Sequence, residues 1–174
     1  YVMGPCDSVV VQLYGKTNNN YRLTVNREGQ IQFPEIGPVT LAGLNFIEAK
    51  NLLNGIVQQQ MIGVSISVTM GALRSIRVFI LGDANKQGPY TVSALSTMTN
   101  ALLQSGGITP IGSLRKVQLR RQGKVVTTLD LYDLLLNGDT SDDARLLPGD
   151  VIFIPPLGNT VAVGGEVRRP AIYE

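Results

Sequence analysis

The chain has 174 residues, of which 44% are hydrophobic and 16% charged, and this balance excludes an intrinsically disordered protein. The net charge of +2 is too small to indicate nucleic acid as a partner, which usually needs a clear basic excess. Histidine is absent and cysteine occurs once, so the sequence offers neither a Ser-His-Asp or Cys-His catalytic set nor an internal disulfide. We therefore expect no enzyme activity, no cofactor, no metal and no nucleic-acid partner.

The first part of the chain predicts short strands separated by turns. Apolar or alternating runs predict strands at 9–13, 22–26 and 30–33. Gly29 supplies the positive φ that a tight turn between the last two strands requires. Pro34 and Gly37 mark a second break.

One main helix and the most regular strand follow. Asn45 and Glu48 form a capping box, which predicts a helix that ends near Gln60. Residues 64–70 alternate with a strict period of two, so their polar side chains gather on one face of a strand. These polar residues either line a path for a polymer or form an ordinary solvated face: Ser65, Ser67 and Thr69.

Residues 71–74 predict a boundary, after which a second unit begins. Its strands are expected at 76–81, 117–120, 124–129 and 151–154. Ser96 or Thr97 caps a short helix closed by Gly106, and Asp130 caps another that ends before Gly138. A local basic cluster is interpreted as the solvated face of the hairpin rather than a phosphate groove: Arg115, Lys116, Arg120, Arg121 and Lys124.

Two pairs of segments echo each other. The run from Val78 to the turn before Tyr90 is repeated from Val161 to Tyr173, and aligning Gly82 with Gly165 gives an offset of 165 − 82 = 83 residues. A repeat of that length is a small domain, so the last residues are expected to begin a second copy. In the other pair, residues 4–7 and 148–150 each place an aspartate in a turn before a buried strand, which ordinary turn chemistry would also produce.

The order and spacing of these segments resemble the polysaccharide biosynthesis/export family of outer-membrane proteins. The first half is similar to the export domain of that family, and the second half to a soluble-ligand-binding β-grasp (SLBB) domain. The resemblance implies an α+β fold of two small domains: an export domain with a mixed sheet and one main helix, then a β-grasp-like domain and the first strands of a second β-grasp repeat. The expected boundaries are 1–73, 74–158 and 159–174.

The resemblance also implies which residues carry the structural motifs. They are Gly4, Asp7, Gly29, Pro34, Gly37, Gly82, Pro89, Gly106, Gly107, Gly149 and Asp150. The family usually has glycine where Cys6 stands, so a Cβ at this position predicts that its backbone does not need a positive φ. Cys6 itself is interpreted as a structural thiol.

As a function, the resemblance implies the periplasmic part of a capsule or exopolysaccharide export channel at the outer membrane. Identical subunits would form a ring, with polysaccharide and an inner-membrane polysaccharide copolymerase as partners and membrane contact only through parts outside these residues. The alternative is a soluble periplasmic carbohydrate-binding module with aromatic platforms drawn from Tyr14, Tyr21, Phe33, Tyr90 and Tyr132. A polysaccharide-processing enzyme is a third hypothesis, which the absence of histidine disfavours.

Overall fold

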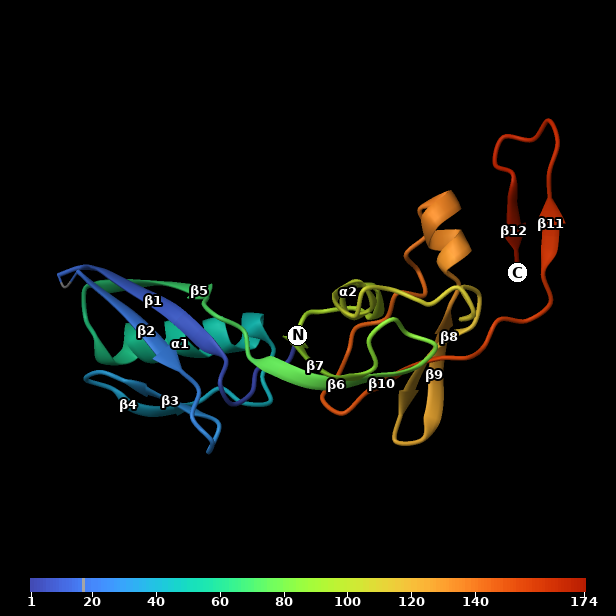
Figure 1. The fold of residues 1–174 in the computed structure, drawn as a ribbon. Helices are drawn as coiled ribbons and strands as arrows, with labels where there is room; N and C mark the ends of the chain where they lie inside the picture. Colours follow the sequence, from blue (N-terminus) through green and yellow to red (C-terminus); the bar gives the residue numbers. More distant parts are fainter. Residues whose placement is uncertain (17) are drawn as a thin grey trace. The chain divides into compact units, whose positions relative to one another are not determined.

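A computed structural model describes residues 1–16 and 18–174 (Figure 1). The chain divides into two compact units, Tyr1–Arg74 and Ser75–Glu174. Both contain strands, and α1 in the first unit is the one long helix of the described residues. The predicted α+β class is therefore confirmed. No helix within the described ranges is long and apolar enough to cross a membrane.

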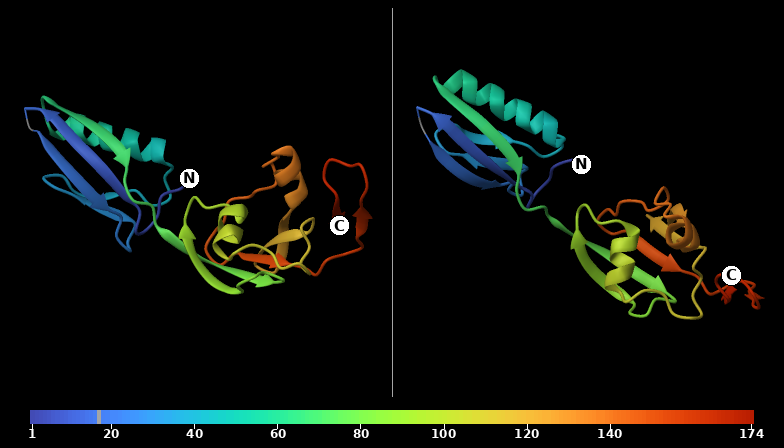
Figure 2. Two further views of the ribbon diagram at one scale, coloured as in Figure 1. Left: turned by 45° about the horizontal axis from the view of Figure 1, so that its top comes forward. Right: turned by 90° about the horizontal axis from the view of Figure 1, so that it is seen from above.

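The first unit is a three-stranded sheet covered on one face by a helix and a small hairpin (Figure 2). Its elements are β1 (Ser8–Gly15), β2 (Asn19–Thr24), β3 (Gln30–Phe33), β4 (Gly37–Thr40), α1 (Phe46–Gln60) and β5 (Val64–Met70). The expected mixed sheet is wrong for this unit: β1 lies between β2 and β5, and both neighbours run antiparallel to it.

Helix α1 begins where the capping box predicts. The Asn45 side chain accepts hydrogen bonds from the N–H groups of Ile47 and Glu48, and the Glu48 carboxylate accepts one of 2.8 Å from the Asn45 N–H. The inward face of the helix places Ala49, Leu53 and Val57 in the core of the unit. Strand β1 contributes its alternate residues to the same core, namely Val9, Val11 and Leu13.

The turn at Gly29 forms, with φ 81°, but the strands on either side of it, β2 and β3, belong to different sheets. Strand β3 pairs with β4, and its register runs from Gln30 opposite Thr40 to Phe33 opposite Gly37. The segment read as a break at Pro34 is the turn of that hairpin. The sequence did not predict β4 because this strand begins with Gly37 and Pro38, which ordinarily indicate a turn.

The second unit contains a five-stranded sheet in the order β7-β6-β10-β8-β9, with α2 on one face (Figure 2). Its elements are β6 (Ser75–Gly82), β7 (Gly88–Ser93), α2 (Met98–Gln104), β8 (Val117–Arg121), β9 (Lys124–Leu129), the π-helix η1 (Asp133–Asn137), β10 (Val151–Ile154), β11 (Val161–Val163) and β12 (Ala171–Tyr173). Strand β10 runs parallel to β6 and antiparallel to β8, so it is the apolar centre of a mixed sheet.

The short helices of this unit follow their predicted caps. Thr97 is the N-cap of α2, and Gly106 follows the C-cap with φ 81°. The Asp130 carboxylate accepts a hydrogen bond of 2.8 Å from the N–H of Tyr132, and Gly138 ends η1 with φ 71°. The helix after Asp130 continues as a π-helix, which the sequence did not indicate.

Strands β11 and β12 form a hairpin that reproduces the β6–β7 pairing. Val161 lies opposite Tyr173 as Val78 lies opposite Tyr90. Each residue of the second pair is thus 83 positions before its counterpart in the first. The hydroxyl of Tyr173 donates to the carbonyl of Arg169 over 2.8 Å, and that of Tyr90 donates to the carbonyl of Lys86 over the same distance. The sequence echo is therefore matched by the same register and the same tyrosine hydrogen bond.

Candidate functional site

The outer face of the β2-β1-β5 sheet is polar. Because directly opposed residues on antiparallel strands point to the same face, Thr69, Ser67 and Ser65 share a face with Val10, Gln12 and Tyr14 of β1. Ser65 and Thr69 are exposed and Ser67 is half-buried, whereas Val68, on the opposite face, is in the core. The predicted separation of polar and apolar faces along β5 is confirmed.

The five candidate aromatic platforms differ in exposure. Phe33 is 2% exposed and belongs to the core, and Tyr21 packs against its ring with the ring centres 6.1 Å apart. Tyr90 and Tyr132 are half-buried. The Tyr14 side chain is 52% exposed and borders an open hollow of about 330 Å³ whose other walls are Gln12, Leu13, Asn18, Asn19 and Asn20.

Asp7 is the last residue of the turn at residues 4–7, which directly precedes β1. Its buried carboxylate accepts hydrogen bonds from the N–H of Gly4 at 2.8 Å, the N–H of Arg74 at 2.9 Å and the Tyr1 hydroxyl. It also forms an ion pair of 2.9 Å with the Arg74 guanidinium. Burial and the bond to Asp7 raise the pKa of the Tyr1 phenol. Asp7 therefore ties the start of β1 to Arg74, in the segment between β5 and β6.

Asp150 has the same arrangement in the second unit. Its carboxylate is fully buried, accepts a hydrogen bond of 2.8 Å from the N–H of Leu147, and binds Arg121 through two bonds of 2.8 Å. In both turns the aspartate accepts from the residue three positions earlier, and its own N–H donates back to that residue's carbonyl over 3.1 Å. The similarity seen in the sequence is thus a shared structural turn.

The backbone at Cys6 contradicts the sequence-based expectation. Its φ is 71°, close to the 84° of Gly149 at the equivalent place in the second turn. A preceding proline and a positive φ at the third residue define a type II turn, so this geometry is needed whichever residue is present. The Cβ of Cys6 therefore adds strain instead of signalling a relaxed backbone.

We expect Cys6→Gly to stabilise the first unit by about 0.5–1 kcal/mol. Glycine removes the strain of a Cβ at positive φ, and this gain exceeds the extra chain entropy that glycine loses on folding. Urea unfolding monitored in the first unit measures this change. Cys6→Ser is the matched control, since it removes the thiol but keeps the Cβ, and it should leave stability nearly unchanged. Destabilisation by the glycine would contradict the expectation.

Most of the remaining predicted motif residues lie at turns. Gly82, Gly37, Gly106 and Gly107 have positive φ, and Pro34 precedes Glu35, whose φ is 67°. Pro89 lies in β7 opposite Phe79. A Cβ on Gly82 would meet the Ile154 carbonyl oxygen at 2.0 Å, so this glycine also allows two strands of the sheet to approach each other.

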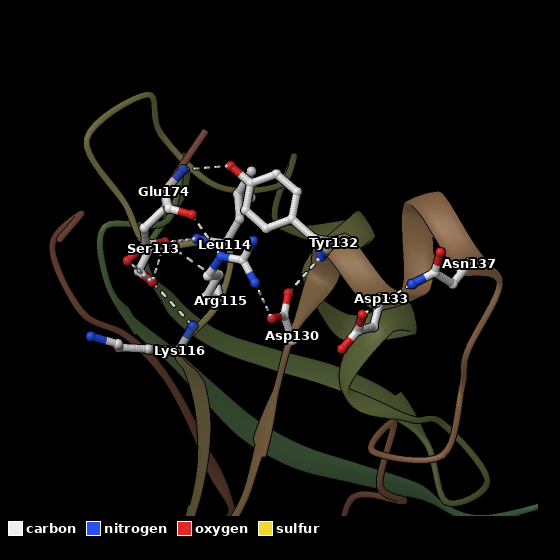
Figure 3. Close-up of polar contacts among 9 residues, drawn as sticks. All are labelled: Ser113, Leu114, Arg115, Lys116, Asp130, Tyr132, Asp133, Asn137 and Glu174. Carbon is white, nitrogen blue, oxygen red and sulfur yellow. Dashed lines mark hydrogen bonds and ion pairs between the residues drawn. The ribbon is translucent and has the colours of Figure 1, made fainter. Parts of the chain in front are cut away.

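A cluster that the sequence did not indicate surrounds Glu174 (Figure 3). Its carboxylate oxygens lie 2.8 and 2.7 Å from the Ser113 hydroxyl and accept hydrogen bonds from the N–H groups of Leu114, Arg115 and Gly158. A recess of about 500 Å³ lies beside the carboxylate, with Leu114, Tyr132 and Ile172 among its walls. Single polar residues that meet from segments about 60 positions apart have no sequence signature, so only the fold brings them together.

Three of the five side chains in the basic cluster of residues 115–124 make contacts within the second unit. Arg115 pairs with Asp130 at 3.0 Å, and Arg121 with Asp150. The Arg120 guanidinium lies 4.2 Å from the centre of the Phe153 ring. These three side chains therefore stabilise the hairpin and its neighbours.

The loop at 138–143, directly after η1, contains three aspartates, Asp139, Asp142 and Asp143, and two of them accept hydrogen bonds from nearby backbone. The Asp143 carboxylate accepts a hydrogen bond of 2.9 Å from the N–H of Thr99, near the start of α2. The Asp139 carboxylate accepts from the Ser141 N–H, and this bond lowers the pKa of Asp139. Within the ranges that the structure describes, no group of three or more potential ligands among Cys, Asp and Glu could hold a metal ion.

Comparisons with known proteins match both units. The model of the polysaccharide biosynthesis/export protein family matches residues 1–71, and the SLBB domain model matches residues 76–154. The chain thus consists of an export domain followed by an SLBB domain. These are the two domain types that the sequence predicted, so the predicted resemblance to polysaccharide biosynthesis/export proteins is confirmed.

Two relatives with named functions align over most of the chain. The polysialic acid transport protein KpsD of Escherichia coli is 28% identical over 176 residues, which cover 100% of this chain and 31% of KpsD. The EPS I polysaccharide export outer membrane protein EpsA of Ralstonia nicotianae is 29% identical over 150 residues, which cover 84% of this chain and 39% of EpsA. The chain therefore spans well under half the length of these relatives.

Proposed function

We propose that this chain is a periplasmic part of an outer-membrane capsule or exopolysaccharide export channel, where it forms part of the wall of an oligomeric ring through which polymer passes. The main support is the order of the two matched domains, an export domain at 1–71 and an SLBB domain at 76–154. The proposed location is the periplasmic face of the outer membrane, which agrees with the name of the EpsA relative. The role is transport, not catalysis.

Exposed apolar side chains support assembly into a ring. On the second unit, Leu103 is 71% exposed, Ile111 66% and Leu135 68%. Small units of this size bury a limited core, and contacts between subunits are a usual source of additional stability. The proposed partners are identical subunits, the exported polysaccharide and an inner-membrane polysaccharide copolymerase. Electron microscopy of the full-length protein should show closed rings, and a strict monomer would remove the ring from the proposal.

We propose the polar face of the first sheet as the surface that meets the polymer. Hydroxyl and amide groups on Ser65, Thr69 and Gln12 offer weak, exchangeable hydrogen bonds, which suit a hydrated chain that must move on. The opposite face of the sheet is covered by α1 and the β3–β4 hairpin, so it is not available.

Bulky substitutions on this polar face test whether it contacts the polymer. In the full-length protein, Ser65→Trp with Thr69→Trp should reduce polymer export several-fold, because two bulky apolar rings replace small polar groups. Asn51→Trp, at an exposed position of α1, is the matched control and should leave export unchanged. Equal export by both variants at equal protein levels would exclude this face as the lining.

The hollow beside Tyr14 favours a second function, a soluble carbohydrate-binding module. The exposed Tyr14 ring offers a flat surface for a sugar ring, and the three neighbouring asparagines offer donors and acceptors for its hydroxyls. Titration of the chain with oligosaccharides cut from the native polymer separates the two functions. Saturable binding at one site that Tyr14→Ala abolishes would favour the module, whereas weak binding without saturation agrees with a conduit wall.

We also propose that residues 159–174 begin a second SLBB copy. The support is the offset of 83 residues shared by the pairing of β6–β7 with β11–β12 and by the two tyrosine hydrogen bonds. The domain boundaries proposed are 1–73, 74–158 and 159–174.

A further inference from the structure

The turn Ser113–Lys116 carries donors that converge on one carboxylate (Figure 3). The N–H groups of Leu114 and Arg115 lie 3.1 and 3.3 Å from Oε2 of Glu174, and the Ser113 hydroxyl contacts both carboxylate oxygens. Gly158 donates to Oε1 over 3.1 Å from a separate segment. Successive backbone N–H groups that face a common point form a concave site for an anion.

The donors of this site are held in place by their own contacts. Ser113 is fully buried, and its hydroxyl oxygen accepts a hydrogen bond of 3.0 Å from the Lys116 N–H. The N–H of Ser113 donates to the Pro155 carbonyl over 2.9 Å. The site thus belongs to the β-grasp body, residues 75–158.

The backbone of Glu174 is bound as well as its side chain. Its carbonyl accepts a hydrogen bond of 2.7 Å from Nε of Arg115, and its N–H donates to the Tyr132 hydroxyl over 3.2 Å. Arg115 is positioned for this by its ion pair with Asp130 and by the Tyr132 ring, whose centre lies 4.6 Å from the guanidinium. The ring of Tyr173 packs near the ring of Tyr132, with 5.8 Å between ring centres.

The C-terminal hairpin, residues 159–174, has little other support. Val161 is 65% exposed and Ile172 70%, so its apolar side chains are not packed into a core. A two-stranded hairpin by itself is marginally stable in water. The equivalent of Glu174 in the first hairpin, 174 − 83 = 91, is Thr91, so the carboxylate is a feature of the second hairpin alone.

We propose that the Ser113–Lys116 turn with Gly158 is a carboxylate receptor, and that Glu174 is its resident ligand and fixes the C-terminal hairpin on the β-grasp body. Within the proposed export channel, this latch sets how the second SLBB copy follows the first. That consequence rests on the proposed function, whereas the latch is a property of the chain itself.

The latch is sensitive to acid. Burial raises the pKa of Glu174, but the hydrogen bonds from Ser113, Gly158, Arg115 and Leu114 together lower it below its ordinary 4.5. Because the folded pKa is depressed, the stabilisation is present above the unfolded value and is lost as the pH falls through the folded value. The other charged or titratable groups that face the site are Arg115, Lys116, Tyr132 and Asp130.

Amide hydrogen exchange followed by NMR tests the latch. Glu174→Gln should accelerate exchange at Leu114, Arg115 and Gly158 by about tenfold or more, since a neutral amide replaces a charged acceptor. Glu166→Gln, at an exposed position of the same hairpin, is the matched control and should change nothing. Protection of β10 reports that the body stays folded. Exchange in Glu174→Gln that matches the wild-type chain would overturn the latch.

Titration with sodium acetate tests the receptor. In Glu174→Ala, acetate should shift the amide resonances of Leu114 and Arg115, while sodium chloride at equal ionic strength should not. Absence of any shift in this variant would overturn the receptor. An equal response of the wild-type chain would mean that Glu174 does not occupy the site and that it is open to carboxylated sugars, which overturns the latch. A lost latch in a protein that still exports polymer would leave the proposed function intact.

Discussion

Replacing Gly82 by alanine is expected to destabilise the second unit by about 4 kcal/mol, through a clash and an unfavourable φ acting together. Gly82 ends β6 with φ 84°, and an added Cβ would lie 2.0 Å from the carbonyl oxygen of Ile154. That oxygen belongs to the backbone of β10 and accepts the N–H of Asp83 over 2.9 Å, so it cannot move without loss of a sheet bond.

Gly149→Ala separates the two causes. Gly149 has the same φ of 84°, but nothing lies within 4 Å of its added Cβ. This control should cost about 1 kcal/mol, the price of a left-handed Cβ alone. Hydrogen exchange of β6 and β10 measures both variants in the second unit. Equal destabilisation by the two substitutions would show that the approach of Ile154 to Gly82 does not matter.

Elements with long regular patterns were predictable from the sequence. The capping box at Asn45 and the period of two along 64–70 each place α1 and β5 within a residue of their bounds, because local propensity and burial agree there. The offset of 83 residues between the two hairpins was also visible in the sequence, whereas their shared register, with Val161 opposite Tyr173, comes from the structure.

The pairing of short strands, and the meeting of residues that are far apart in the sequence, could not be predicted in the same way. The β3–β4 hairpin was not predicted because β4 begins with Gly37 and Pro38, which indicate a break, and the turn before Gln30 suggested a different partner. Cys6 was misread because side-chain identity was taken as evidence for φ, whereas Pro5 and the buried Asp7 impose the turn regardless. Glu174 meets Ser113 only through the fold, so no local pattern could identify the receptor.

Removing the Asp150 carboxylate is the other substitution with a large expected effect. Asp150→Ala should destabilise the second unit by about 3 kcal/mol, because it leaves the Leu147 N–H without its acceptor and the Arg121 guanidinium without its partner. The Arg121 side chain is 33% exposed and can turn toward water, which keeps the loss near the lower end for a broken buried pair. Asp150→Asn retains one acceptor and should cost less.

Three comparisons decide whether the buried pair is the cause. Asp142→Asn, at an exposed position, should stay within about 0.5 kcal/mol of the wild-type chain. A double-mutant cycle with Arg121→Gln isolates the pairwise energy, which should be a large part of the total. Asp7→Ala should have an equivalent effect confined to the first unit, since Asp7 accepts the Gly4 N–H and pairs with Arg74 in the same turn geometry. If Asp7→Ala and Asp150→Ala left both units as stable as before, the two turns would be incidental. If each unfolds only its own unit, the turn with its aspartate and arginine is what starts the first strand of the export domain and the central strand of the SLBB domain.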